Sequence, residues 1–240
     1  SGYGLEAYPN MSRMDWAVEL FQWFNYYLKD IGDEPEPMVQ IQTNDGRWHV
    51  EDTWPPEDMT WNLADIGTDW TVTGDTVNGQ GASVTLVSGE LTELTHISGL
   101  PTLHLEVTTQ ACQGGQIFAT LYDNEDNLRL GHATMDVRYR DGGYDAKATS
   151  PFSSYTMLME FNPLDVVVPA GHTLRIELTE NGEDYLPSPC ASNPLGGLTV
   201  DGGVVGLPII DRPKSHDSWF LLRRGGTNSL FQNNPRKISC

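Results

Sequence analysis

Serine side chains are the groups in this sequence that could carry hydrolytic chemistry. A serine nucleophile needs a neighbouring base that a third group holds in place. Ser153, Ser154 and Ser188 stand in segments rich in turn residues. The sequence contains no Gly-x-Ser-x-Gly motif, which would place a serine on a sharp strand-to-helix turn. We therefore predict no catalytic residue in this chain.

Histidine and acidic side chains could instead hold a metal ion. The 6 histidines show no His-x-His or His-x-x-x-His spacing, so a zinc site is not expected. His104 alternates with leucines and His172 follows a Pro-Ala-Gly turn, which favours structural roles for both. The run DNEDN (residues 123–127) offers oxygen ligands, but it lacks the ligand order of an EF-hand loop. We interpret this run as a polar hairpin turn and expect no metal and no cofactor.

The three cysteines show no CxxC motif. Cys112 follows one expected strand, and Cys190 lies in a Pro-Ser-Pro-Cys loop after another, so both could lie at one end of a β-sandwich. A Cys112–Cys190 disulfide is predicted, which would leave Cys240 single. Three reduced thiols are the alternative.

Charge excludes several classes of partner. The formal net charge is -19, yet residues 212–240 hold six cationic residues and one acidic residue. Such an acidic body repels nucleic acids and anionic membranes. No apolar run approaches the roughly 18 residues of a membrane span. Scarce lysine together with the acid excess suggests a high-salt source. We expect an extracellular or cell-surface location, with the cytoplasm of a halophile as the alternative.

The first element expected from hydrophobic periodicity is an amphipathic helix that starts near Asp15 and ends at Gly32. Its apolar positions recur at three- and four-residue steps: Trp16, Leu20, Trp23, Phe24, Tyr27 and Leu28. A β-hairpin is predicted next, because Val39 and Ile41 alternate before an Asn44-Asp45-Gly46 turn.

From residue 80 onward the pattern changes to short alternating runs that turn residues separate. They are ASVTLVS, TLHLEVTT, QIFATLYD, HATMDVRY, YTMLMEF, VVVPAG, HTLRIELTE and GLTVDGGVVGLPII. About eight such strands without a helical pattern between them predict an antiparallel β-sandwich. We expect residues 1–79 to form the helix, hairpin and linker, 80–213 the sandwich, and 214–240 a basic extension.

Three tryptophans lie in the Asp-rich connection before residue 80: Trp54, Trp61 and Trp70. Exposed indole rings can stack on sugar rings, which makes a lectin-like carbohydrate-binding module one alternative function. The other interpretation is that these rings fill the seam between helix, hairpin and sheet.

The order of several motifs resembles one family. WFNYYLKDIG, PMVQIQTNDGRWHVEDTWPP, SGLPTLHLEVTT, VVVPAGHTLRIELT and GLPIIDRP are similar to the C-terminal jelly-roll domain of Xaa-Pro dipeptidyl-peptidases and cocaine-esterase-like serine hydrolases. The resemblance covers roughly residues 8–213. It implies a mainly β, galactose-binding-like jelly-roll sandwich and an upstream α/β-hydrolase domain with a Ser–Asp–His triad. The place of the triad histidine falls near Glu6, and no histidine precedes His49. No triad residue can be transferred to this chain.

The resemblance implies that the aromatic helix packs on a hydrolase domain or chain, which would be the partner. We predict an interface formed by Trp16, Leu20, Trp23, Phe24 and Tyr27, with Arg223 and Arg224 of the tail holding an acidic neighbour. Copies of the same chain could take that place, as an oligomer or as the structural subunit of an extracellular filament or surface layer.

Overall fold

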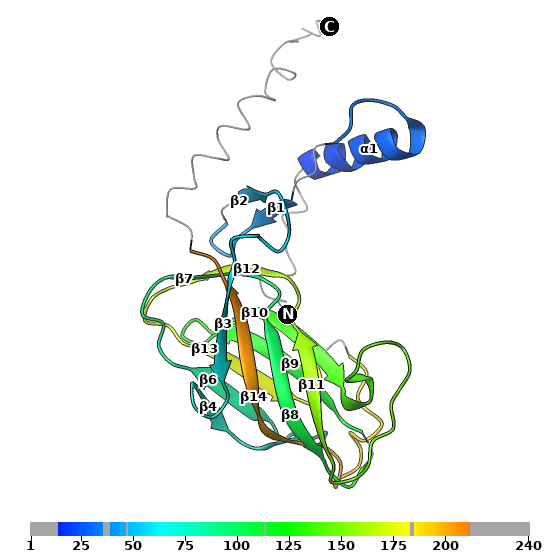
Figure 1. Cartoon of the computed structure of the whole chain (residues 1–240), viewed down its shortest axis with the longest axis vertical. Helices are drawn as coiled ribbons and strands as arrows, with labels where there is room; N and C mark the ends of the chain where they lie inside the picture. The colour runs from blue at the N-terminus through cyan, green and yellow to red at the C-terminus, as the bar shows by residue number, and fades with distance from the viewer. Residues whose placement is uncertain (1–13, 36–38, 47, 113, 183–184, 212–240) are drawn as a thin grey trace, which may run out of the picture.

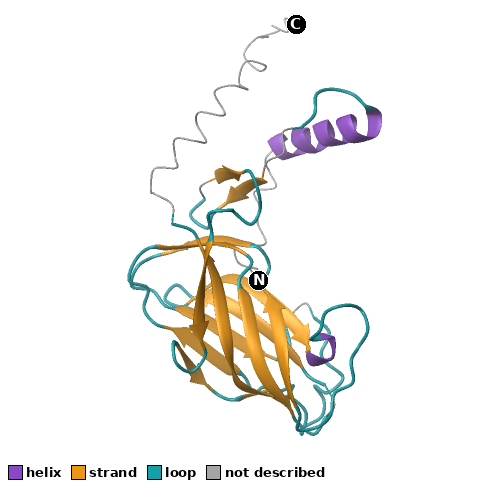
Figure 2. Cartoon of the chain, in the orientation of Figure 1, coloured by secondary structure: helices purple, strands orange, loops and turns teal. Residues whose placement is uncertain are grey.

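A helix and a small hairpin precede a two-sheet β-sandwich (Figures 1 and 2). The structure is a computed structural model, and it describes residues 14–35, 39–46, 48–112, 114–182 and 185–211. The basic extension expected at 214–240 lies outside the described residues. In Figure 1 the hairpin lies between the sandwich and the helix.

Helix α1 (Met14–Lys29) ends three residues before Gly32, the residue predicted to stop it. Asp30 adopts a left-handed backbone conformation with φ of 51°. Its N–H donates to the carbonyl oxygen of Tyr26 at 3.1 Å, and the N–H of Ile31 donates to that of Asn25 at 3.0 Å. The bond from Asp30 is that of an αL cap, and both bonds satisfy carbonyl groups that the end of a helix leaves free.

The predicted hairpin is confirmed. Strands β1 (Val39–Gln42) and β2 (Trp48–Glu51) pair antiparallel, with Gln42 opposite Trp48. The turn closes where the N–H of Gly46 donates to the carbonyl of Thr43 at 2.9 Å. Gly46 has φ of 84°, a conformation that glycine adopts at little cost.

The sandwich contains two antiparallel sheets, so the predicted mainly β fold class is confirmed. The five-stranded sheet has the order β10 (Leu128–Asp136), β9 (Gln116–Asp123), β13 (Leu174–Thr179), β6 (Val84–Ser88) and β4 (Trp70–Thr73). The other sheet has the order β11 (Ser154–Glu160), β8 (Thr102–Thr109), β14 (Leu198–Ile209), β7 (Thr95–Gly99) and β12 (Leu164–Val168). Strands β3 (Thr60–Asp65) and β5 (Thr76–Val77) also pair with β14.

The core lies between the two sheets and follows the two-residue period of the strands. On β8, Leu103, Leu105 and Val107 are fully buried, whereas His104 and Glu106 face solvent. The opposite sheet contributes side chains such as Leu121 and Ile176 to the same core. Burial of these apolar side chains is the main term that stabilises the sandwich.

Strand β14 carries a bulge, and a glycine just after it lies very close to β8. Its register with β8 shifts between Val200 and Gly202. Gly203 has φ of 148°, and a Cβ atom there would lie 2.0 Å from the carbonyl oxygen of His104. A larger residue would therefore push the two central strands apart.

The predicted domain boundary at residue 80 is wrong. Strands β3, β4 and β5, all within residues 60–77, pair with β14 or β6 and belong to the two sheets. The segment is rich in Thr, Asp and Gly, which made it look like a linker. Backbone pairing with long neighbouring strands overrides that weak local preference. The sandwich therefore starts at Thr60, and β7 is a further strand that the sequence pattern did not indicate.

One side chain attaches the hairpin to the sandwich. The amide of Asn44, in the hairpin turn, donates from Nδ2 to the carbonyl oxygen of Val167 at 2.9 Å. Its Oδ1 accepts from the N–H of Val167 at 2.8 Å. Val167 lies on β12, the last strand in the order of its sheet. The amide thus pairs with both backbone groups of one residue, as a neighbouring strand would.

We predict that Asn44→Ala releases the hairpin from the sandwich. Two part-buried hydrogen bonds would be lost, each with a net contribution of about 0.5–1.5 kcal/mol. Hydrogen exchange at the Val167 amide should accelerate by roughly tenfold or more. The control is Asn62→Ala, at an exposed position of β3. Unchanged protection of Val167 in Asn44→Ala would contradict this role.

Candidate functional site

The apolar face of helix α1 is exposed to solvent. Eight large side chains of residues 18–31 have exposed fractions between 37% and 70%. They are Val18, Leu20, Phe21, Trp23, Phe24, Tyr27, Leu28 and Ile31. Soluble monomers rarely expose a contiguous apolar surface of this kind, so it indicates an interaction site.

The aromatic rings of this face contact one another. The ring of Trp23 lies 5.3 Å from that of Phe24 in an edge-on arrangement and 4.9 Å from that of Tyr27. Tyr26 meets Tyr27 edge-on at 4.9 Å. Rings held in this way form a pre-arranged surface, which lowers the entropy lost when a partner binds.

The structure places four of the predicted interface residues on one exposed helix: Leu20, Trp23, Phe24 and Tyr27. The side chain of Trp16 and the residues Arg223 and Arg224 lie outside the described residues. The described parts of the hairpin and sandwich leave this face uncovered, and in Figure 1 α1 stands clear of both sheets.

The three tryptophans proposed to bind sugars have different environments. Trp70, on β4, is 2% exposed and belongs to the core, so it cannot stack on a ligand. Trp54 is half-buried. Trp61 is 46% exposed, on β3 beside Gly206. The carbohydrate-binding interpretation is therefore wrong for Trp70, and the three rings do not face solvent together.

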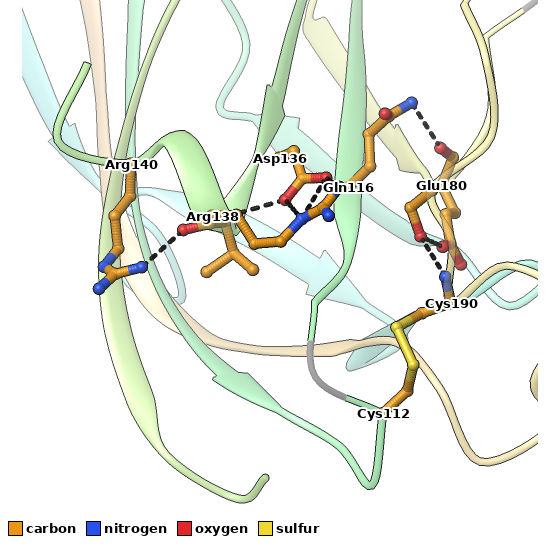
Figure 3. Close-up of polar contacts among 9 residues, drawn as sticks. Cys112, Gln116, Asp136, Arg138, Arg140, Glu180 and Cys190 are labelled. Carbon is orange, nitrogen blue, oxygen red and sulfur yellow. Dashed lines mark hydrogen bonds and ion pairs between the residues drawn. A yellow bond between two sulfur atoms is a disulfide. The ribbon is translucent and has the colours of Figure 1, made fainter. Parts of the chain in front are cut away.

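A disulfide links two loops at the end of the sandwich away from the hairpin. Cys112, after β8, is bonded to Cys190 in the β13–β14 loop, with Cα atoms 5.9 Å apart (Figure 3). The two ends of the sandwich are marked by the two ends of β14. Leu198, at its start, pairs with Thr109, three residues before Cys112, whereas Ile209, at its other end, pairs with Ile97 of β7. This is the pairing proposed from the sequence.

A buried acid lies close to the disulfide. Glu180 is 2% exposed, and its Oε1 accepts a hydrogen bond from the hydroxyl of Ser188 at 2.6 Å. The hydroxyl oxygen of Ser188 accepts the N–H of Cys190 at 3.1 Å. Burial raises the pKa of Glu180, against the effect of the Ser188 and Gly79 hydrogen bonds. Ser188 is thus held by a carboxylate and a backbone amide, which is not the arrangement of a nucleophile beside a base.

Arg138 and Asp136 form an ion pair on the same side of this end (Figure 3). The Nε of Arg138 donates to the two carboxylate oxygens of Asp136 at 3.0 and 3.1 Å. This hydrogen bonding raises the pKa of Arg138 above its ordinary value. Nearby, Arg140 donates to the carbonyl oxygen of Val137 at 2.9 Å. These contacts fix the 3-10 turn Val137–Tyr139 that follows β10.

The opposite end of the sandwich holds a histidine among carboxylates. The Nδ1 of His172 lies 2.8 Å from Oδ1 of Asp123, a buried residue at the end of β9. His172, Asp123 and Asp126 each offer a ligand atom within 4.8 Å of the others, so they could hold a cation. The bond to Asp123 raises the pKa of His172, and the protonated ring can itself balance the acids.

The predicted polar turn at DNEDN is confirmed, since residues 124–127 form the turn between β9 and β10. Sequence reasoning did not connect this turn to His172, which is 49 residues from Asp123. A second such pair joins His96 of β7 to Asp165 of β12 at 2.7 Å. Both pairs tie neighbouring segments of the sandwich together, in keeping with structural roles for these histidines.

No helix within the described residues is both long and apolar enough to cross a membrane.

The helix, the hairpin and the two packed sheets form a β-sandwich domain that carries an exposed aromatic helix. Residues 32–195 match the family model described as the X-Pro dipeptidyl-peptidase C-terminal non-catalytic domain. The chain belongs to this family, as the sequence motifs indicated.

The chain is also similar to several larger proteins. It is 24% identical over 229 residues to a protein of Bacillus anthracis named "Putative Xaa-Pro dipeptidyl-peptidase". The match covers 83% of this chain and 38% of that protein, so the chain spans well under half of this relative.

Solved structures share the fold. A CocE/NonD family hydrolase from Staphylococcus aureus superposes with a TM-score of 0.59 at 12% identity, over 82% of this chain and 46% of that one. An aminopeptidase from a marine sediment Thaumarchaeota archaeon gives a TM-score of 0.60 at 15% identity, over 80% and 44%. At these identities the likeness concerns the fold.

We predict that the contribution of His172 to stability depends on pH. Because the pKa of His172 is raised above its ordinary value of 6.5, the contribution is complete below that pH. It is lost as the pH rises through the folded-state pKa. His172→Gln should therefore cost more stability at pH 5.5 than at pH 8.5, measured as the midpoint of urea unfolding.

The matched control is the same substitution in an Asp123→Asn background, where the pH dependence should largely disappear. An equal cost of His172→Gln at every pH would contradict this prediction.

Proposed function

We propose that this chain acts by packing the exposed face of α1 on the α/β-hydrolase domain of an Xaa-Pro dipeptidyl-peptidase-like serine hydrolase. The hydrolase domain could be on the same polypeptide or on a separate chain. The exposed cluster of aromatic rings on α1 is the observation that supports this most directly. The family match supports the identity of the partner.

The position of α1 supports the same proposal. The helix lies beyond the hairpin, at the end of the sandwich opposite the disulfide (Figure 1). It is also the first described element of the chain. A hydrolase domain that precedes the helix in sequence would be joined to the chain next to the aromatic face, and farther along the chain from either sheet.

Burial of these side chains would make a favourable contribution to association, to be set against the entropy that association loses. Full burial of one large apolar side chain contributes about 1.5–3 kcal/mol. Trp23, Phe24, Tyr27 and Phe21 are each roughly half exposed or more. Burying their exposed parts would contribute on the order of 3–6 kcal/mol. Such an apolar contact is insensitive to salt, unlike a contact between the acidic body and a basic tail.

The role of the chain in this proposal is architectural. The hydroxyl of Ser188 is bonded to Glu180, and that of Ser154 to the hydroxyl of Thr108. Neither serine is set beside a histidine base. Hydrolysis of an acyl or peptide substrate would therefore be carried out by the partner, with the β-sandwich fixing the partner's position.

We expect that Trp23→Ala weakens binding to a hydrolase domain of this family from the same organism by at least tenfold. Trp23 contacts two other rings, so its loss disrupts the cluster, and central aromatic residues dominate interface energies. Sedimentation of the two proteins at 0.1 and 1 M salt would measure the effect. Tyr144→Ala is the control, because Tyr144 is a fully exposed aromatic residue of the sandwich.

Two results would contradict the proposal. One is equal affinity of wild type and Trp23→Ala for the hydrolase domain. The other is a wild-type chain that sediments as a dimer or larger assembly through Trp23 and does not bind the hydrolase domain, which would mean that α1 joins copies of this chain.

We also infer that the chain matures in an oxidising compartment, at the cell surface or outside the cell. The Cys112–Cys190 bond supports this, because disulfides rarely persist in a reducing cytosol. Alkylation of protein from its native cells, followed by mass spectrometry, should find both cysteines unmodified until a reductant is added. Immediate labelling of Cys112 and Cys190 would point to the cytoplasmic alternative.

A further inference from the structure

The disulfide loop, defined as residues 185–197, is the part of the β13–β14 connection that leads into β14 at Leu198. Two kinds of contact close it on the sandwich. The first is the covalent bond from Cys190 to Cys112. The second is a chain of hydrogen bonds from the N–H of Cys190 to the hydroxyl oxygen of Ser188, and from that hydroxyl to the carboxylate of Glu180.

Backbone contacts complete the closed arrangement. The N–H of Ala111 donates to the carbonyl of Leu195 at 3.1 Å, and that of Gln110 donates to the carbonyl of Gly197 at 3.1 Å. The side-chain amide of Gln80 donates to the carbonyl of Ala191 at 3.3 Å. These bonds are few compared with those of a strand, so the loop can open without the sheets unfolding.

Glu180 is the weak point of this arrangement. Its Oε2 is buried and has no well-formed hydrogen bond among the described residues. Asp136, at the end of β10, is the charged group that acts on Glu180 from a neighbouring element; it repels the carboxylate and is itself paired with Arg138. Hydrogen bonds from Ser188 and Gly79 favour the ionised form of Glu180, but burial and the acidic neighbour outweigh them and make that form costly.

We propose that the disulfide loop is a latch under joint control of redox state and pH. When the disulfide is intact, the loop stays closed whether or not Glu180 is ionised. When the disulfide is reduced, the loop stays closed with Glu180 protonated and opens when Glu180 loses its proton to become hydrated.

The redox step needs a dithiol reductant. Its thiolate attacks the sulfur of Cys112, which is less buried than Cys190. The bond between the two protein sulfurs breaks, and Cys190 leaves as a thiolate that takes up a proton. The second thiol of the reductant then displaces Cys112, which leaves two protein thiols and an oxidised dithiol.

Arg138 is placed to assist this step. A Cβ atom placed on Gly114 would lie 3.5 Å from Sγ of Cys190 and 3.7 Å from Nε of Arg138, so the cation and the departing thiolate both lie next to Gly114. A neighbouring arginine stabilises a thiolate and makes it a better leaving group.

The direction of the pH effect follows from linkage. Because burial raises the pKa of Glu180 above its ordinary value of 4.5, the closed loop binds the proton more tightly than the open loop does. The preference for the closed state is complete below pH 4.5 and falls as the pH rises through the raised pKa. Each unit of pKa difference changes the opening equilibrium by about tenfold.

Hydrogen exchange of the full chain, followed by mass spectrometry of peptides from residues 185–197, tests the proposal. Exchange is measured between pH 4.5 and 8, with and without a phosphine reductant, and corrected for the intrinsic pH dependence of amide exchange. In the oxidised chain, protection should be constant. In the reduced chain, protection should fall by about tenfold or more as the pH rises.

Glu180→Gln is the decisive variant, because glutamine keeps an acceptor for Ser188 and cannot ionise. Reduced Glu180→Gln should stay protected at every pH, whereas Glu160→Gln, at an exposed position of β11, should behave like wild type. A Cys112→Ser/Cys190→Ser double variant replaces chemical reduction and should reproduce the reduced chain.

Three outcomes would overturn the proposal. The first is parallel pH dependence in reduced wild type and reduced Glu180→Gln. The second is a reduced wild-type loop with the same protection at every pH. The third is loss of the whole sandwich on reduction, seen as lost protection in β8 and β9, which would mean that the disulfide loop is not an independent unit.

Discussion

The pairing of β14 with its neighbours is the interaction on which the rest of this structure depends. One edge of β14 bonds to β8 and, at Ile209, to β7, while the other edge bonds to β5 and β3. This one strand thereby joins residues 60–77 to the body of the sandwich. The close approach of Gly203 to the carbonyl of His104 makes the arrangement possible, because no other residue fits there.

The long strand also separates two ends with different chemistry. At one end, near Ile209, lie the hairpin and the aromatic helix, whose apolar face is exposed to solvent. At the other, near Leu198, lie the disulfide and the buried Glu180. The proposed contact of α1 and the proposed opening of the disulfide loop therefore involve opposite ends of β14. The two can be altered independently by substitution.

Strong local patterns made much of this predictable from sequence. The alternation of TLHLEVTT corresponds to β8 in full, and the periodic aromatic residues of α1 gave the helix and most of its exposed face. Strands β3 and β4 were missed because the segment around them is rich in Thr, Asp and Gly, so only pairing with β14 and β6 makes them strands. The His172–Asp123 pair and the Asn44–Val167 contact join segments 49 and 123 residues apart, and no local pattern reports such contacts.

The contact of Asn44 with Val167 has a consequence for solubility. Strand β12 ends the order of its sheet, and an uncovered edge strand offers free N–H and C=O groups to any other chain. The hairpin turn occupies both groups of Val167, in the middle of a run of apolar residues, VVV. A fragment trimmed to start at Thr60 would keep both sheets but lose this cover. Such a fragment would be prone to edge-to-edge aggregation. The hairpin therefore covers an edge strand of the sandwich as well as linking the sandwich to the helix.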